Sequence, residues 1–523
     1  MKATPQTWIR GLRRIIRPSF ASLFIVVGMA RGADSASPQA ELRPLNLPDC
    51  LKLALEHNLD LQIERKNTKI VEAALYGSYG AYDPAFRLGV SQSREDVPSR
   101  LDVSKNTPTL GAPHEKYDTT LLNGGIVGKL PSGGTYDIGT SYSRTKAWSD
   151  LNTFVFADFY RTNNYIGGTA LNLSQPLLRN FWIDSDRLQI QVNKKQLKVT
   201  DMAVLSRIML VVHDVLRAYA DLLHVQESVA VWEDAHNHAL RLLKDVKSRI
   251  QAGTLPALEE RLFAFAVESL QADLDQARQM LQPAQSALRN LISSDLQDWI
   301  HAAPVAQGTL SDVEEHFNQV EAWREAMTRR PEIRQMQLDL EKRDIVLRYS
   351  RNQLYPSLDL VGSLGLSGIS SSVGNAYDKV ANGSHSSYSY GAVMNVPLSN
   401  RSARGALRAA RETKEQALLQ LKKLEMDILT GVETAGRAMV SSYKQINSRR
   451  QAIQFAQQVV ESEEAKIRLA QTSSFNATEA RKRLTGAKLA HLKALLDYNQ
   501  ARTANSYSQG KILDQQSISV DFK

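Results

Sequence analysis

Apolar residues recur at steps of three and four over two long stretches of the chain, which is the spacing of one face of an α-helix. Neither glycine nor proline occurs between Leu177 and Ala252. We therefore expect one unbroken helix over 184–252, about 100 Å long at about 1.5 Å per residue. Helices of that length are typical of coiled coils and helical tunnels. The repeating positions include Val204, Ile208, Val211 and Val215 in the first half and Leu421, Leu424, Ile428 and Val432 in the second.

Shorter stretches alternate apolar and polar residues with a period of two, which indicates β-strands with one apolar face. In the second half they cover 357–367 and 388–398, and the serine-, glycine- and asparagine-rich residues between them predict a surface loop. Each stretch is about ten residues long, the length that crosses an outer membrane as a tilted strand.

The two halves of the chain repeat each other. Pro84 matches Pro356 at an offset of 272 residues, and Pro176 matches Pro397 at an offset of 221. Each half predicts the same series of helix, strand, loop, strand, very long helix and second helix, with these prolines at the strand entries. The predicted organisation is a signal peptide (1–32), an N-terminal extension (33–46), a first repeat (47–300; strands 84–94 and 166–176, long helices 184–252 and 257–293), a connector (301–317), a second repeat (318–510; strands 357–367 and 388–398, long helices 401–471 and 476–509) and a tail (511–523).

The net charge of +9 and the pI near 9.3 raise the question of a nucleic-acid partner. Six of the nine charges lie in the first 32 residues, which contain no acid. The apolar run Phe20–Ala30 follows them and is too short to span a bilayer, so we expect a secretory signal peptide, with an uncleaved anchor as the alternative. Its removal would leave +3, and nucleic acid is not expected as a partner.

Little in the sequence favours catalysis. The segment 124–130 resembles a phosphate-binding loop, but its spacing is one residue short and a leucine replaces the required hydroxyl residue. His236 and His238 are two apart on a helix and face different directions. The lone Cys50 excludes an internal disulfide framework and a multi-cysteine metal site, and it is expected to be a packed helix residue. We predict no enzyme activity, no cofactor and no metal.

A signal peptide, short amphipathic strands and very long helices together favour an oligomeric outer-membrane channel with a periplasmic helical conduit. Two strands per half cannot close a barrel, and open strand edges are not tolerated in lipid, so several chains would share one barrel. The alternative is a secreted or periplasmic coiled-coil scaffold or adhesin without a pore. That alternative does not explain paired amphipathic strands at matching places in both halves.

At this level the chain resembles the TolC-type outer-membrane efflux proteins, over the whole mature sequence. The resemblance rests on the order and duplication of 47–58, 173–179, 249–259 and 354–358. It implies a mainly α fold with a small β part: a homotrimer whose shared β-barrel continues as a long periplasmic α-helical barrel, with two repeats per chain. It also implies the outer membrane of a diderm bacterium, a periplasmic adaptor protein and, through it, an inner-membrane pump that supplies the energy. The cargo would be drugs, small toxic solutes or polypeptides, and either efflux or type I secretion fits.

The resemblance places a glycine at each periplasmic tip, where the long helices turn back. Gly253 fits the first tip, but Thr472 stands at the second, and threonine adopts a positive φ poorly. The second tip is therefore expected to have another shape. The residues implied in adaptor docking are Gly253, Thr254, Leu255, Glu259, Thr472, Ser473 and Ser474.

The resemblance also implies a narrowed entrance with paired aspartates after the second tip. The matching positions hold Thr478 and Arg481, or Glu479 and Lys482 if the register slips by one. Because three-fold symmetry turns an inward charge into a ring, we hypothesise a less cation-selective, anion-favouring entrance. The alternative interpretation is a solvated helix face.

The first half holds a further alternation, over 124–130 and 136–142, which predicts an extra hairpin. It could add two membrane strands per subunit, giving about eighteen per trimer, or be an extracellular extension of a twelve-stranded barrel. The sequence favours the extension. The residues that could form an aromatic girdle nearby, or simply pack in a loop, are Phe154, Phe156, Phe159, Tyr160 and Tyr165.

Overall fold

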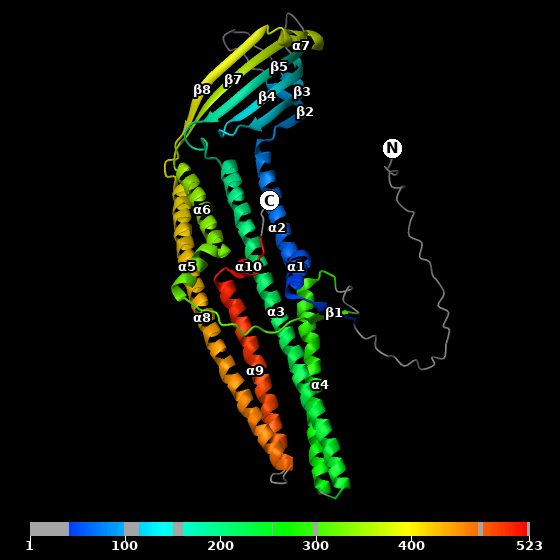
Figure 1. Cartoon of the computed structure of the whole chain (residues 1–523). Helices are drawn as coiled ribbons and strands as arrows, with labels where there is room; N and C mark the ends of the chain where they lie inside the picture. Colours follow the sequence, from blue (N-terminus) through cyan, green and yellow to red (C-terminus); the bar gives the residue numbers. More distant parts are fainter. Residues whose placement is uncertain are drawn as a thin grey trace, which may run out of the picture.

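The computed structural model describes residues 41–98, 114–149, 160–253, 255–295, 302–468 and 474–519. A β-sheet lies at one end of the molecule and long helices extend from it to the other end (Figure 1). The predicted signal peptide over 1–32 lies outside the described residues. None of the helices in the described ranges is both long enough and apolar enough to cross a membrane.

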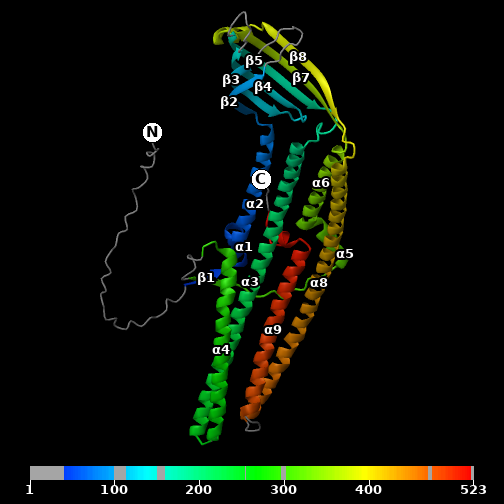
Figure 2. The same ribbon diagram turned by 180° about the vertical axis from the view of Figure 1, so that it is seen from behind.

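The helical part consists of two antiparallel pairs of long helices, α3 with α4 and α8 with α9 (Figures 1 and 2). α3 packs against α9, so the two pairs lie side by side. Shorter helices pack against the part of the long helices nearer the sheet (Figure 1), and they are α1 and α2 in the first repeat and α5 and α6 in the second. The bounds are α1 Leu47–His57, α2 Leu59–Ser78, α3 Ser185–Gln251, α4 Ala257–Ile292, α5 Gln319–Arg329, α6 Pro331–Asn352, α8 Arg401–Arg468, α9 Ser474–Ser508 and α10 Ile512–Gln515, with a 3₁₀ turn η1 at Tyr79–Tyr82.

Local sequence signals account for the length of α3. Asp184 caps its first turn, because the carboxylate accepts hydrogen bonds from the N–H groups of Asp186 and Arg187, both at 2.8 Å. No glycine or proline interrupts the following 67 residues. Its buried face, which includes Val212, Val215 and other apolar residues of the predicted periodicity, packs in the largest core cluster. Cys50 of α1 is fully buried in the same cluster.

The sheet has six strands in the order β2-β3-β4-β5-β7-β8, and every neighbouring pair is antiparallel. The first half therefore contributes four strands and the second half two. The strands are β2 Ala85–Pro98, β3 His114–Lys129, β4 Thr135–Ser149, β5 Tyr160–Pro176, β7 Ser357–Ser370 and β8 His385–Asn395.

The extra hairpin predicted over 124–142 is part of this sheet. That it forms an extracellular extension of the barrel stays a prediction. It forms β3 and β4, which lie between β2 and β5 and pair with both along their whole lengths. The prediction of a surface loop over 368–387 is wrong in part, because this segment contains the short helix α7, Val373–Ala381. Of the aromatic girdle candidates, 154–159 lie outside the described residues.

A second, two-stranded sheet lies beside the helices. It pairs β1, Glu41–Leu45, in parallel with β6, Ala302–Ala306. The hydroxyl of Tyr219 on α3 lies 2.6 Å from the carbonyl oxygen of Gln307 and 3.1 Å from that of Leu45. The beginning of the described chain and the start of the connector between the repeats are thereby both fixed to α3.

Candidate export duct and its periplasmic tips

One face of the six-stranded sheet is apolar and exposed. A single row of register partners crosses all six strands on this face. Five of the six side chains are exposed in the single chain, from 45% for Ile126 to 77% for Tyr388, and Leu171 is half-buried. A continuous exposed apolar face of this size marks a contact with lipid or protein. The row is Phe86, Ile126, Ile138, Leu171, Leu364 and Tyr388.

The opposite face is polar and concave. The row of register partners next to the apolar row faces this side, and it includes Asp137, Asn172, Ser363 and Ser389. The carboxylate of Asp137 forms an ion pair with Arg87, at 3.0 Å, on this face. A hollow of about 600 Å³ is lined from all six strands at this row, so the sheet curves around its polar side. The apolar face is therefore the outer, convex face.

The four prolines predicted at strand entries lie where the sheet meets the helices, but only two of them precede a strand. The prediction is wrong for Pro176 and Pro397, which lie where strands end. Pro84 and Pro356 directly precede β2 and β7. Pro176 is the last residue of β5, and Pro397 lies two residues beyond the end of β8. Proline has no N–H for the strand ladder, so it is tolerated at strand ends and marks the boundary between sheet and helices.

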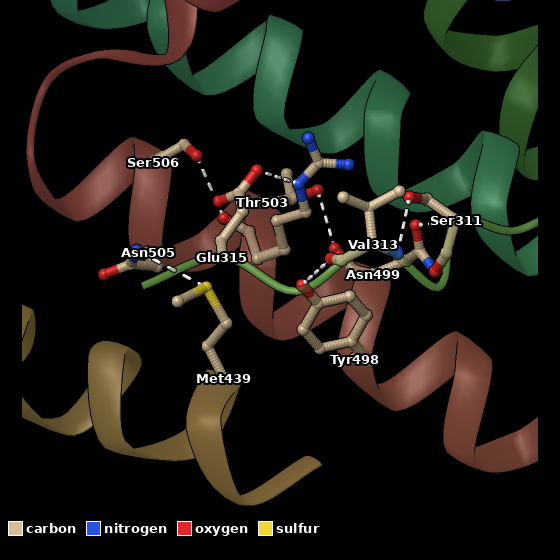
Figure 3. A network of polar contacts seen from close by, with 10 residues as sticks. Ser311, Val313, Glu315, Met439, Tyr498, Asn499, Thr503, Asn505 and Ser506 are labelled. Carbon is tan, nitrogen blue, oxygen red and sulfur yellow. Dashed lines mark hydrogen bonds and ion pairs between the residues drawn. The ribbon is translucent and has the colours of Figure 1, made fainter. Parts of the chain in front are cut away.

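After β6, a connector over 307–318 joins the repeats, and α5 begins at Gln319. The connector crosses α9 (Figure 3). The Asn499 side chain exchanges two hydrogen bonds with the backbone of Ser311, at 2.9 and 3.3 Å. Two more anchors come from the same helix: Tyr498 donates to the carbonyl of Val313, and Arg502 pairs with Glu315. The connector therefore ties the first repeat to the last long helix of the second.

The first helical tip, where α3 turns back into α4, has the glycine turn that the family resemblance implies. Gly253 has φ of +75°, and its N–H donates to the carbonyl of Ile250 at 2.9 Å. No atom lies within 4 Å of a Cβ placed there, so the turn requires glycine for its backbone conformation and not for space. Leu255 follows in the turn and Glu259 lies in the first turn of α4.

The second tip is described only in part. Thr254 of the first tip and Thr472 and Ser473 of the second lie outside the described residues, and Ser474 is the first residue of α9. The role of all seven tip residues in adaptor docking stays a prediction.

The basic stretch after the second tip is largely paired. Arg481 forms an ion pair with Glu464 of the facing helix α8, and both side chains are 30% exposed. Arg483 pairs with Glu479 one turn earlier, at 3.2 Å. Lys482 is exposed. Sequence reasoning missed Glu464, because this partner comes from another helix and not from the local sequence.

The entrance is expected to be less cation-selective than an acidic one, and Arg481→Asp should raise its cation selectivity. The substitution would place a second carboxylate beside Glu464 in each subunit and so an acidic ring near the entrance. Reversal potentials of the purified channel in a salt gradient would measure the change. Lys482→Asp serves as the comparison for a register slip. Strong cation selectivity that Arg481→Asp leaves unchanged would contradict the hypothesis.

Acidification should destabilise the helical part. His224 and His238 of α3 and His491 of α9 are partly buried, and desolvation lowers the pKa of each below its ordinary value of 6.5. Because the folded protein disfavours the imidazolium, the unfolded chain binds more protons, and stability is lost as the pH falls below about 6.5. The melting temperature of the purified oligomer, measured against pH, should fall there, and less steeply in His238→Gln. A melting temperature independent of pH through this range would contradict it.

Residues 322–504 match the family model of the outer membrane efflux proteins. A comparison with curated protein sequences gave no significant match.

Solved structures of outer-membrane channels have the same fold. The Campylobacter jejuni CmeC channel matches 89% of this chain over 85% of its own, with a TM-score of 0.62 and 16% identity. VceC from Vibrio cholerae matches 89% of this chain over 96% of its own, with a TM-score of 0.60 and 14% identity. The open state of the Neisseria gonorrhoeae MtrE channel matches 89% over 89%, also at 0.60 and 14%. The resemblance seen in the sequence is confirmed: the chain has the fold of the TolC-type outer-membrane channels, and the family model that its residues 322–504 match is that of the outer membrane efflux proteins.

Proposed function

We propose that three copies of this chain form the outer-membrane exit duct of a tripartite efflux pump or a type I secretion system. The duct would be a passive conduit and not an enzyme. An inner-membrane transporter would supply the energy, and a periplasmic adaptor would dock at the helical tips. The cargo would be drugs, small solutes or polypeptides.

One observation carries the proposal: a curved sheet with an apolar outer face and a polar inner face continues directly into helices of about 100 Å. The apolar face suits lipid and the polar face suits a water-filled lumen. The long helices are of a length that crosses much of the periplasm.

Exposed apolar residues on the helices support self-association. Phe265 on α4 and Leu419 and Phe455 on α8 are 65–74% exposed in the single chain. Neighbouring copies would cover such side chains in a closed helical barrel. A secreted scaffold without a pore would use the helices but would leave the apolar face of the sheet unexplained.

Extraction and sizing test the proposal. Membranes from a diderm host that expresses the full chain would be separated by density, and the protein extracted with detergent and sized. We expect it in the outer-membrane fraction, soluble only with detergent, and with the mass of three chains. A water-soluble monomer would contradict the proposal.

A further inference from the structure

The inserted hairpin has the same two faces as the strands around it. On β4, Tyr136, Ile138 and Tyr142 alternate with Asp137, Gly139 and Ser141. Ile138 is the register partner of Leu171 on β5, which is the partner of Leu364 on β7. The three side chains therefore share one face, on which Ile138 and Leu364 are both exposed in the single chain.

An aromatic cluster also joins the hairpin to the neighbouring strand. Tyr142 of β4 stacks on Tyr165 of β5, with ring centroids 6.0 Å apart. The Arg144 guanidinium lies over the Tyr165 ring at 5.5 Å and donates to Asn163 at 3.2 Å. On this face of β4 and β5, the hydrogen-bonded threonines Thr140 and Thr169 and then the apolar Ile138 and Leu171 lie toward the helices from the cluster. Lys146 and Asn163 lie on its far side, as at a membrane–water interface. The hairpin and β5 therefore meet this boundary together.

The edges of the sheet allow the copies to join. Since every neighbouring pair is antiparallel, β2 and β8 at the two edges run in opposite directions. β8 of one copy can thus pair antiparallel with β2 of the next, and lipid requires such pairing because it offers no partner to free backbone groups. An even number of strands per copy keeps the closed barrel antiparallel throughout.

We propose that all six strands of each chain enter the membrane, so that the trimer closes an eighteen-stranded barrel. This inference rests on the proposed function and deepens it. At a strand spacing of ~4.8 Å and a tilt of ~40°, eighteen strands give a backbone diameter of about 36 Å, against about 24 Å for twelve. One lumen-facing row holds Arg87 on β2 and small residues on the other five strands, Gly125, Gly139, Ala170, Gly365 and Ser387. The barrel would then be a wide aqueous section that admits bulkier cargo, with size selection left to the helical tips.

Thiol labelling of the full-length trimer in lipid nanodiscs tests the inference. Cys50 is fully buried and its thiol pKa is raised to about 11, mainly by desolvation, so it stays unreactive at neutral pH. Two matched pairs of single cysteines are introduced: Ile138→Cys and Ser141→Cys on β4, and Leu364→Cys and Ser363→Cys on β7. A charged maleimide should label Ile138→Cys at least about tenfold more slowly than Ser141→Cys, as lipid shields the outer face. The β7 pair should show the same ratio.

The β7 pair distinguishes a failure of this inference alone from a failure of the membrane assignment itself. If Ile138→Cys reacts as fast as Ser141→Cys while Leu364→Cys stays protected, the hairpin lies outside the membrane and the inference is overturned, with the proposed function intact. If Leu364→Cys reacts as fast as Ser363→Cys, the membrane assignment fails and the inference falls with it. Electron cryomicroscopy of the same trimer gives a second readout: eighteen strands are expected, and twelve would overturn the inference.

Discussion

Replacing Glu332 with alanine should destabilise the protein by about 2–3 kcal/mol, because it leaves Arg330 without its carboxylate in a mostly buried site. The two side chains form a two-pronged ion pair, at 3.0 and 3.1 Å, and are 23% and 13% exposed. We expect less than the ~3–5 kcal/mol of a fully buried pair, since some water reaches both groups.

The same pair holds three helices together, which adds to the expected loss. The Glu332 carboxylate accepts a hydrogen bond from Ser206 of α3 at 2.9 Å. The Arg330 guanidinium donates to the carbonyl of Tyr507 at 3.1 Å and lies over its ring at 4.9 Å. Loss of Glu332 should therefore loosen the contact of α6 with both α3 and α9.

Glu433→Ala is the matched control for this prediction. Glu433 pairs with Arg437 one turn along α8, and the arginine is 71% exposed. An exposed pair of this kind contributes about 0.3–0.5 kcal/mol. Thermal unfolding of the purified oligomer, followed by helical circular dichroism, should show a clear drop in Tm for Glu332→Ala and almost none for Glu433→Ala. Equal shifts would contradict the assignment.

Gly436→Ala should also destabilise the protein, by about 1–3 kcal/mol, since the buried glycine leaves space for the ring of Phe317. A Cβ at position 436 would lie 2.2 Å from that ring. Phe317 is part of the connector and packs between two hydrophobic clusters along α8. The added methyl group would push the connector away from α8.

Gly431→Ala, five residues earlier on the same helix, should act in the opposite direction. Gly431 is exposed, and no atom lies within 4 Å of its missing Cβ. Alanine favours the helix over glycine by about 1 kcal/mol. The same unfolding measurement should give a lower Tm for Gly436→Ala and an unchanged or higher one for Gly431→Ala. A Tm raised by both substitutions would show that Phe317 yields without cost.

Much of the helical part could be predicted from the sequence because its signals are local and repeated. The absence of glycine and proline after Leu177 and the apolar steps through Val215 both describe one long helix, and α3 is that helix. The second half repeats the pattern in α8. A periodicity that extends over many turns leaves few alternative structures for the chain.

The sheet is harder to predict, because side chains on neighbouring strands pack over positions where a strand has only glycine. On β3, Gly124 and Gly128 occupy the apolar face, so the strand looks weak by itself. The Tyr136 ring of β4 lies across Gly128, where a Cβ would be 2.4 Å from its hydroxyl oxygen. The segment that forms α7 was predicted as loop from its small polar residues. Its helix rests on Gly167 and Gly368 of two other strands, which leave room for Ala376 and Val380.

The candidate site could likewise be predicted only where the signal lies in the local sequence. The repeat located the two prolines that precede strands, Pro84 and Pro356, and the family resemblance located the glycine of the first tip. The roles of these residues follow from their own backbones. The partner of Arg481 could not be predicted, since Glu464 lies on a facing helix, 17 residues away. Charges near the entrance therefore cannot be counted from one helix alone.

Planar-bilayer recording of the purified full-length oligomer tests the central claim most directly. We expect discrete, long-lived conductance steps, since a closed barrel continued by a helical duct forms a permanent aqueous path. A preparation that inserts into the bilayer as an intact trimer but passes no current, under any voltage or salt gradient applied, would contradict the account.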